Sequence, residues 1–426
     1  MTVTGLVASP IPARPARPAR PGWRRRLTPS SAVLLGAGLL VLLSVVRIIT
    51  GANDITSSGT TGAALRLAVP IGLAGLGGLW AERSGVVNIG LEGQLILGTW
   101  FGAWGAYEYG AWWGVVAGIF GGVLGGLVHA MATVTFGVDH IVSGVALNIL
   151  GAGVTRFLSA LIFTGTPGGG VTQSPVLPSI GTVTVPGLSS GLHTVEHRHW
   201  FLVSDLAGVL GGLVTGVSLL TLVAVALVPL SYWALWRTKL GLRIRSCGEN
   251  PVAAESLGVH VYRMKYLAVA ISGGCAGLGG AFLSEVATSI YREGQTNGRG
   301  YIGLAAMIFG NWRPGGLAAG AGLFGYTDAL QLRSGGQSVH ALLLVLAGGL
   351  AALAVRGLLR RRIVAASVTF GVAVLALVWF LASSTVPDEF VGFAPHLTTL
   401  LVLSLAAQRL RMPAADGKPY RRGEDQ

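Results

Sequence analysis

Residues 246–260 read SCGENPVAAESLGVH, a polar stretch that stands between two long apolar segments. Asn250 is a residue type that caps helix N-termini, and Pro251 suits the first position of a helix. Gly258 can take the left-handed conformation that ends a helix. The pattern predicts a helix of about two turns, which is marginal in water by itself. We therefore expect this helix to rest either on its own bundle or in a groove of a cytoplasmic partner.

The composition around this stretch is that of a membrane protein. Of 426 residues, 52% are hydrophobic and 11% are charged, whereas soluble domains carry about 25% charged residues. We expect an all-α polytopic membrane protein with about 10–12 transmembrane helices, some of them discontinuous. The apolar runs that predict these helices lie at residues 31–49, 62–80, 86–106, 112–134, 140–163, 206–236, 265–287, 301–331, 340–358, 363–383 and 393–408. The run 301–331 is broken by NWRPGG, which fits either two short spans or one discontinuous helix.

Clusters of Lys and Arg, within a net charge of +13, set the expected orientation. They precede the first apolar run, follow the run that ends at residue 236, occupy 356–362 and close the chain. Because such clusters mark cytoplasmic segments, both termini and the loop 237–264 are expected inside, and the loop 164–205 outside. The clusters lack interleaved aromatic residues, so the charge does not indicate binding to nucleic acid.

Three parts are expected along the chain. Residues 1–30, rich in Pro, Arg and Ala, predict a disordered basic cytoplasmic tail that contacts anionic membrane lipid. Residues 31–408 form the transmembrane domain, and residues 409–426 form a second cytoplasmic tail. Small residues on one helix face let neighbouring backbones approach closely. Helix packing of this kind is predicted for Gly114, Gly118, Gly122 and Gly126.

Polar residues interrupt the apolar segment WAERSGVVNIGLEGQ, residues 80–94. A charge at the centre of a bilayer costs roughly 2.5–3.5 kcal/mol on insertion scales, so an unpaired, lipid-facing Glu is not expected. Glu82 and Arg83 fit either a cytoplasmic turn or a broken helix whose backbone lines a pathway. Asn88 and Glu92 lie deeper in the run and are expected to face the substrate pathway.

Further polar residues lie in later apolar runs. His129, Asn148 and Asn311 fit either hydrogen bonds between helices or contacts within the pathway. Asp328 is ionisable and needs a partner or a wet cavity. We add Asn311 and Asp328 to the candidate pathway.

The segment HTVEHRH, residues 193–199, spaces His193 and His197 as a helical zinc site would. The surrounding Pro and Gly do not favour a helix, so the sequence predicts a solvated loop and no metal site. The chain contains no recognisable nucleophile–base set, carboxylate pair or phosphate-binding Gly-Lys loop. We therefore expect neither an enzyme nor a bound cofactor.

Four blocks of the sequence resemble one family of membrane proteins. TKLGLRIRSCGENPVAAESLGVHVYRMKYLAVAISGGCAGLGGAFLSE (238–285) resembles the coupling loop and following span of ABC-transporter permeases of the branched-chain amino acid, simple sugar and nucleoside group. LWAERSGVVNIGLEGQLILGTWFGA (79–103) resembles the front signature of the nucleoside-type members. GRGYIGLAAMIFGNWRPGG (298–316) and PHLTTLLVL…GKPY (395–420) resemble a third and a fourth block.

The resemblance, which spans most of residues 60–420, implies a permease subunit of an ATP-driven importer in a bacterial plasma membrane. It implies a cytoplasmic ABC ATPase, a sibling permease and an extracytoplasmic substrate-binding lipoprotein as partners. Nucleosides are the implied cargo, with simple sugars such as ribose or galactose as the alternative. The ATPase would grip the short helix, and the implied coupling positions are Glu249, Asn250, Pro251, Ala253, Ala254 and Gly258.

The sequence also departs from that family. The basic tail is additional, the outer loop is long, and residues 340–383 add two spans. A secondary transporter is the less favoured alternative, because it would need inverted repeats and its own ion site, and the sequence shows no convincing repeat.

Overall fold

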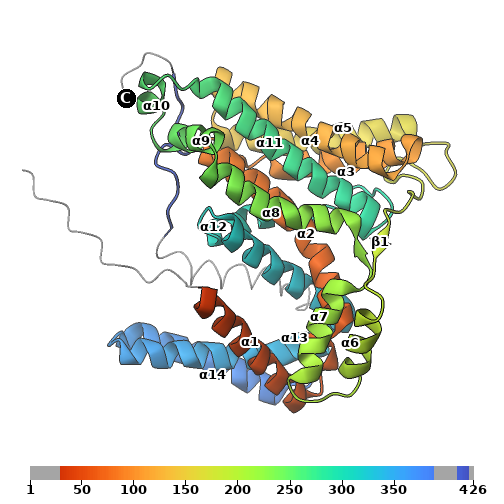
Figure 1. The fold of residues 1–426 in the computed structure, drawn as a ribbon, viewed down its shortest axis with the longest axis vertical. Helices are drawn as coiled ribbons and strands as arrows, with labels where there is room; N and C mark the ends of the chain where they lie inside the picture. Colours follow the sequence, from red (N-terminus) through yellow and green to blue (C-terminus); the bar gives the residue numbers. More distant parts are fainter. Residues whose placement is uncertain (1–28, 388–409, 422–426) are drawn as a thin grey trace, which may run out of the picture.

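The computed structural model describes residues 29–387 and 410–421, which are largely helical (Figure 1). The expected tail up to residue 28 and the apolar run 393–408 lie outside the described residues. In chain order, with 3-10 and π-helical turns labelled η, the elements are α1 (Pro29–Thr50), η1 (Asn53–Thr56), α2 (Ser58–Arg83), α3 (Leu91–Tyr109), α4 (Ala111–Ala130), η2 (Met131–Thr135), α5 (His140–Ile162), β1 (Thr182–Val183), α6 (Leu188–Glu196), α7 (Val203–Val214), β2 (Val217–Ser218), α8 (Leu219–Arg237), α9 (Lys239–Glu249), α10 (Pro251–Ser256), α11 (Val261–Phe282), η3 (Leu283–Ala287), α12 (Arg299–Phe309), α13 (Pro314–Leu359) and α14 (Ile363–Ala382).

Membrane-spanning segments dominate this architecture, which confirms an all-α polytopic membrane protein. Three apolar helices of 10–17 residues are shorter than these membrane-spanning segments. They are Gly36–Thr50 within α1, α7 and α12. The expectation of about 10–12 spans is therefore met only if shorter helices of this kind are counted as well. Among the described residues, the seven segments long and apolar enough to cross a membrane are Ser58–Arg83, Ala111–Thr135, His140–Ile162, Leu219–Arg237, Val261–Ala287, Gly335–Leu359 and Ile363–Ala382.

The long helices of the bundle run between two ends (Figure 1). One end carries α9 and α10 and is called the α10 end; the opposite end carries the two strands and is called the β1 end. Helix α4 packs against α3 and α11 through glycines. A Cβ atom added to Gly122 would lie 2.1 Å from the carbonyl oxygen of Gly273, and one added to Gly118 would lie 2.9 Å from that of Gly98. Side chains are excluded there, so the three backbones touch directly.

In the sequence, residues 206–236 form one apolar run. The structure divides this run into two helices. Helix α7 ends at Val214, and β2 pairs antiparallel with β1 before α8 begins. Gly216 turns the chain with a φ of +61°, and the Ser218 side chain accepts the N–H of Leu220 at 3.2 Å to cap α8. A turn and a cap inside an apolar run are short-range signals that hydrophobicity alone conceals.

The prediction of a solvated loop at His193 and His197 is wrong, because His193 lies within helix α6 and His197 caps it. The rings of the two residues stack with centroids 5.9 Å apart. Pro186 and Gly187 precede the helix and do not interrupt it, with Gly187 at its N-cap in a positive-φ conformation. Among the described residues, no group of three or more His, Cys, Asp or Glu side chains is arranged to hold a metal ion.

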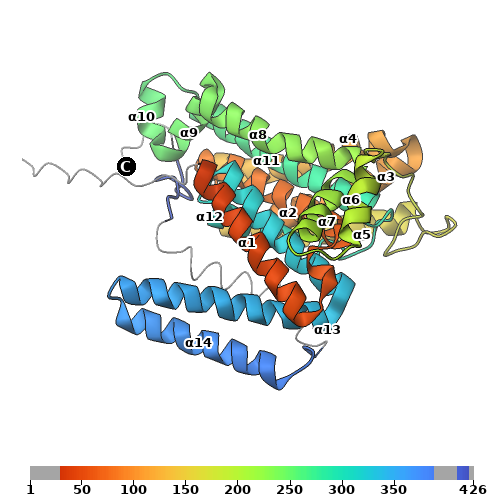
Figure 2. The ribbon, with the colours of Figure 1, turned by 60° about the horizontal axis from the view of Figure 1, so that its bottom comes forward.

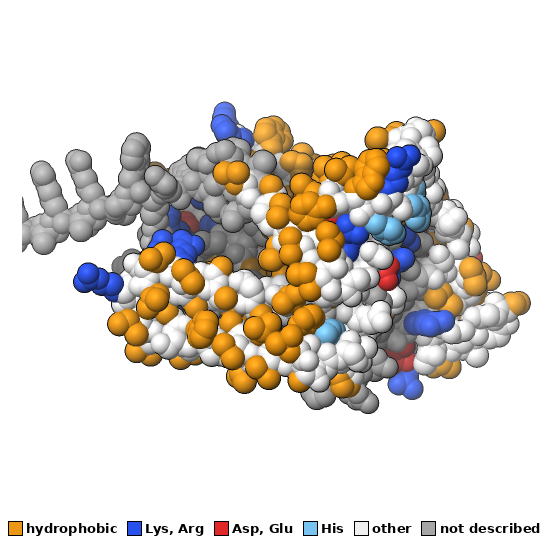
Figure 3. Space-filling view, turned by 90° about the horizontal axis from the view of Figure 1, so that it is seen from below, with side chains coloured by type: hydrophobic (Ala, Val, Ile, Leu, Met, Phe, Trp, Pro, Cys, Tyr) orange, Lys and Arg blue, Asp and Glu red, His pale blue; other side chains and the backbone are white. Residues whose placement is uncertain are grey.

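The broken run 301–331 forms two helices, α12 and α13, with a turn at residues 310–313. Asn311 and Trp312 both have positive φ, and Pro314 occupies the first turn of α13. Helix α13 then continues through a kink at Gly335 to Leu359. Its second half and α14 form a hairpin that stands apart from the main bundle (Figure 2). Apolar side chains are spread over the face of the molecule that includes this hairpin (Figure 3), as expected for helices that face lipid.

Candidate functional site

Two turns that end helices, one after α2 and one after α12, lie next to each other near the α10 end. Helix α2 ends at Arg83, and Ser84 and Gly85 form a turn in which Gly85 has a φ of +84°. The Glu82 carboxylate accepts the indole N–H of Trp312, and the Arg83 guanidinium donates to the carbonyl oxygen of Trp312 at 2.7 and 3.2 Å. The structure shows a turn and a broken helix here, and the pathway role of this segment stays a prediction. A turn follows Arg83, and irregular, largely buried backbone continues to the start of α3.

Glu92 lies in the first turn of α3 and caps a different helix. Its carboxylate accepts the N–H of Gly298 at 3.0 Å and that of Gly300 at 2.7 Å. These groups belong to the N-terminus of α12, where backbone N–H groups lack partners within the helix and the helix dipole favours a negative charge. The Glu92 side chain is buried, so the contact takes the place of hydration.

Asn88 is fully buried and lies close to this junction. Its amide nitrogen donates to Gln94 Oε1 at 3.0 Å and to Ser272 Oγ at 2.9 Å. The Asn88 side chain therefore ties the backbone before α3 to the middle of α11. Gln94 and Ser272 were not identified from the sequence, because a single Gln or Ser in an apolar helix carries no distinctive signal.

Asn148 of α5 completes the junction. Its side-chain oxygen accepts the N–H of Gly93 at 2.7 Å, and its amide nitrogen donates to the carbonyl oxygen of Ile89 at 3.1 Å and to the hydroxyl of Tyr301 at 2.8 Å. Tyr301 is 47% exposed. The hydroxyl of Tyr301 thus links the buried polar groups to the surface of the bundle.

An ion pair lies beside these groups. Arg299 Nη2 of α12 lies 3.7 Å from Asp328 Oδ2 of α13, and both side chains are mostly buried. Asp328 therefore has the partner that the sequence required. We call Asn88, Glu92, Asn148, Arg299, Tyr301 and Asp328 the mid-bundle cluster.

The mid-bundle cluster lies at the level of Ser272, near the centre of the span formed by α11 and η3. Helix α12 begins in the cluster and ends at the turn next to Arg83. Its 11 residues extend about 16 Å, roughly half of a hydrocarbon core about 30 Å thick. Helix α12 is thus a half-length helix whose N-terminus lies inside the bundle. Transporters place such helix ends at their substrate and ion sites.

Asn311 lies apart from the cluster, at the other end of α12. Its side-chain oxygen accepts the N–H of Arg411 at 2.7 Å. The structure therefore brings three of the four candidate pathway residues together and leaves Asn311 at the α10 end.

The second candidate site is the short helix α10, whose predicted boundaries are confirmed. The Asn250 side chain accepts the N–H of Ala253 at 3.0 Å, Pro251 is the first helical residue, and Gly258 follows the helix with a φ of +82°. Glu249, the last residue of α9, contacts Arg83 at 4.0 Å.

Helix α10 has a buried face and an exposed face. Pro251 and Ala254 are buried against α9 and α11, whereas Val252, Ala253 and Leu257 are exposed. Leu257 is 85% exposed. The exposed face of α10 is therefore partly apolar, with Val252 and Leu257 on it.

Residues 60–354 match the model of the family described as "Branched-chain amino acid transport system / permease component". The chain is 32% identical over 370 residues to the guanosine ABC transporter permease protein NupQ of Bacillus subtilis, covering 85% of this chain and 96% of that protein. It is 30% identical to the nucleoside ABC transporter permease protein NupC of Lactococcus lactis, covering 82% and 93% of the two chains.

A third relative is described by a different cargo. The chain is 35% identical to the putative glucose ABC transporter permease protein TsgC13 of Haloferax volcanii, covering 65% of this chain and 78% of that protein. No solved structure gives a significant match. The family model covers more than half of the chain, and the matched residues include both the mid-bundle cluster and α10. The chain therefore belongs to the permease-component family of branched-chain amino acid transport systems.

Proposed function

We propose that this chain is the membrane-spanning permease subunit of an ATP-driven importer of nucleosides. The observation that carries the cargo assignment is the similarity to NupQ, which extends over 96% of that guanosine permease. NupC, a nucleoside permease, supports the same cargo at similar coverage. Simple sugars are the alternative, favoured by the shorter match to TsgC13.

The mid-bundle cluster supports a place for the pathway. Glu92, Asn88 and Asp328 hold the starts of α3 and α12 to the middle of α11 and to α13 by polar contacts. The hydroxyl of Tyr301 connects these polar groups to the surface of the bundle. In this proposal the nucleoside passes Tyr301 and Asn148, and the buried groups fix the start of α12. Movement of α12 then opens or closes the path beside Tyr301.

Helix α10 is the proposed contact for a cytoplasmic ATPase. Its exposed residues Val252, Ala253 and Leu257 would enter a groove on the ATPase, while its buried face rests on the bundle. Displacement of α10 reaches the pathway through Glu249 and Arg83, because Arg83 holds the turn at which α12 ends. This proposal places the α10 end and both termini in the cytoplasm, in agreement with the basic clusters.

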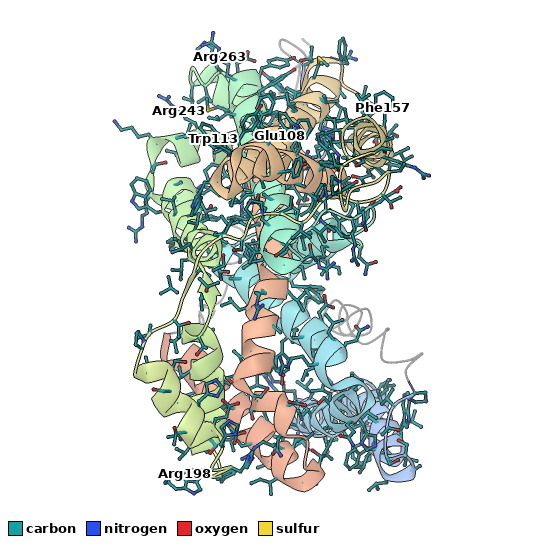
Figure 4. The ribbon with its side chains drawn as sticks, turned by 90° about the vertical axis from the view of Figure 1, so that its right-hand side faces the viewer. Glu108, Trp113, Phe157, Arg198, Arg243 and Arg263 are labelled. Atoms are coloured by element: carbon teal, nitrogen blue, oxygen red, sulfur yellow. The ribbon has the colours of Figure 1, made fainter. Side chains whose placement is uncertain are left out.

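A sibling permease is the proposed partner of α5. This helix packs through one face only, made by residues that include Leu147, Gly151 and Ser159. Ile149 is 71% exposed and Phe157, at the edge of the bundle in Figure 4, is 67% exposed. Tyr301 lies beside α5 and accepts a hydrogen bond from its Asn148, so a sibling chain placed against α5 would enclose the path. An extracytoplasmic binding protein would deliver cargo at the β1 end.

Uptake of labelled nucleosides in cells with and without the gene tests the proposal, with labelled ribose and galactose run in parallel. Loss of nucleoside uptake alone is the expected result. Loss of sugar uptake with normal nucleoside uptake would support the importer assignment and change the assigned cargo to simple sugars. Normal uptake of all these compounds in the deletion strain would contradict both assignments.

A further inference from the structure

The C-terminal residues 410–421 lie across the α10 end of the bundle (Figure 1). The N–H of Ala415 donates to the carbonyl oxygen of Gly248 at 2.9 Å, and the N–H of Ala414 donates to Glu249 Oε2 at 3.4 Å. Gly248 and Glu249 end α9, directly before α10. The C-terminal segment is therefore attached by its backbone to the residues from which α10 starts.

Tyr420 attaches the same segment to α10 itself. Its hydroxyl donates to Glu255 Oε2 of α10, and its side chain packs with Cys247, Ala254 and Val261. The Tyr420 ring lies against Tyr262, with centroids 5.7 Å apart, and only 7% of Tyr420 is exposed. Tyr420 thus holds α10 from the side opposite to the exposed Ala253.

The segment also contacts the turn after α12 and the turn after α2. The N–H of Arg411 donates to Asn311 in the turn between α12 and α13. A Cβ atom added to Gly85, in the turn after α2, would lie 3.1 Å from the carbonyl oxygen of Ala415. One short segment therefore touches α10, the end of α2 and the end of α12.

Helix α10 needs such support for mechanical reasons. It has six residues, and a helix of that length is not stable or rigid by itself. Of its own residues only Pro251 and Ala254 are buried. A force applied to its exposed face would distort the helix unless another element held its far side.

We infer that residues 411–420 form a brace that positions α10 and passes its displacement to the turns after α2 and α12. Tyr420 is the positioning residue, acting through Glu255, and the brace itself does not contact the cargo. The inference rests on the proposed function of α10 as the ATPase contact.

The test uses the complete importer, with its ATPase, reconstituted in lipid nanodiscs or vesicles. Tyr420→Phe removes the hydroxyl and keeps the ring, Glu255→Ala removes the acceptor, and Glu255→Gln keeps an acceptor oxygen. Tyr266→Phe is the matched control, because its hydroxyl contacts Thr135 of η2 and no residue of the brace. For each variant we would measure nucleosides transported per ATP, the KM for nucleoside, and retention of the ATPase during size-exclusion chromatography.

We expect Tyr420→Phe and Glu255→Ala to lower the number of nucleosides transported per ATP by about three- to tenfold, as loss of a charge-assisted hydrogen bond allows. The KM and ATPase retention should stay as in the wild type. The double variant should be no worse than either single variant, because both remove the same contact. Glu255→Gln should retain most of the coupling, and Tyr266→Phe all of it.

Two results would separate failure of the brace from failure of the proposed function. If Tyr420→Phe and Glu255→Ala couple normally while Leu257→Asp releases the ATPase, the brace is wrong and the docking role of α10 stands. If Leu257→Asp retains both the ATPase and normal transport, α10 is not the contact, and both proposals are overturned.

Discussion

Glu92 Oε2, on the first turn of α3, accepts the backbone N–H of Gly300, on the first turn of α12, at 2.7 Å. The two residues are 208 positions apart in the chain. Each of the two helices begins inside the bundle, so this one carboxylate fixes the relative position of two helix starts. The contact is the strongest structural argument for a functional centre at mid-bundle.

Glu92→Gln is expected to impair transport without preventing assembly. A glutamine offers one acceptor oxygen, so either the buried N–H of Gly300 or the partly buried N–H of Gly298 loses its partner, at a cost of about 1–3 kcal/mol. The charge that favours the α12 N-terminus is lost as well. Nucleoside uptake should fall by about five- to 150-fold, the factor to which that range of free energy corresponds.

Glu108→Gln is the matched control, since Glu108 lies at the exposed end of the same helix (Figure 4). It should transport as the wild type does. Unchanged uptake kinetics in Glu92→Gln would remove Glu92 from the pathway.

Gly300→Ala tests the close approach at the same contact. A Cβ atom on Gly300 would lie 2.6 Å from both the backbone nitrogen and the Cα of Glu92, so the start of α12 must shift away from α3. We expect a lower melting temperature of the purified permease and strongly reduced uptake. Gly315→Ala is the comparison, because no atom lies within 4 Å of its Cβ position. In that open helical position alanine should be neutral or stabilise by about 0.5–1 kcal/mol. Equal melting temperatures for the two variants would contradict the packing argument.

The features that the sequence predicted are those encoded by neighbouring residues. Asn250, Pro251 and Gly258 lie within nine positions of one another, and they define α10 through capping preferences that do not depend on the rest of the fold. The same holds for the apolar spans, which require only length and hydropathy. The class of the protein and its short helix were therefore accessible before the structure.

The features that the sequence missed depend on residues far apart in the chain. Glu92 was assigned to the pathway from its depth alone, and its partners Gly298 and Gly300 could not be found by spacing. Tyr420 and Glu255 are similarly distant, and nothing in their local sequence indicates the contact. The break between α7 and α8 is different, because Gly216 and Ser218 carried a turn and cap signal that the high hydrophobicity of the run obscured.

Ala253→Glu and Ala254→Glu should separate docking from folding in α10. Ala253 is exposed and Ala254 is 2% exposed, although the two residues are adjacent. A glutamate at 253 should leave the melting temperature unchanged and abolish co-purification of the ATPase. A glutamate at 254 buries an unpaired charge and should lower the melting temperature, with loss of the ATPase as a consequence. Retention of the ATPase by a folded Ala253→Glu variant would show that the exposed face of α10 is not the docking surface.

Asp416 should make attachment of the C-terminal segment depend on pH. Burial raises the pKa of the Asp416 carboxyl to about 7, even though Lys265 and Arg83 lie near enough to oppose the shift. The Glu82 carboxylate of α2 faces it as well. When the segment detaches into water, the pKa of Asp416 should return to about 4. The attached state therefore binds the proton more tightly than the detached state.

The sign of the pH effect follows from this difference. The contribution of Asp416 to attachment is complete below about pH 4 and is lost as the pH rises through about 7. The hydrogen-exchange protection factor of the Ala415 amide, which donates to Gly248, should be about 30-fold higher at pH 5.5 than at pH 8, as these two pKa values imply. In Asp416→Asn, which carries no titratable carboxyl, that ratio should approach one. A variant with the same pH dependence as the wild type would assign the effect to another group.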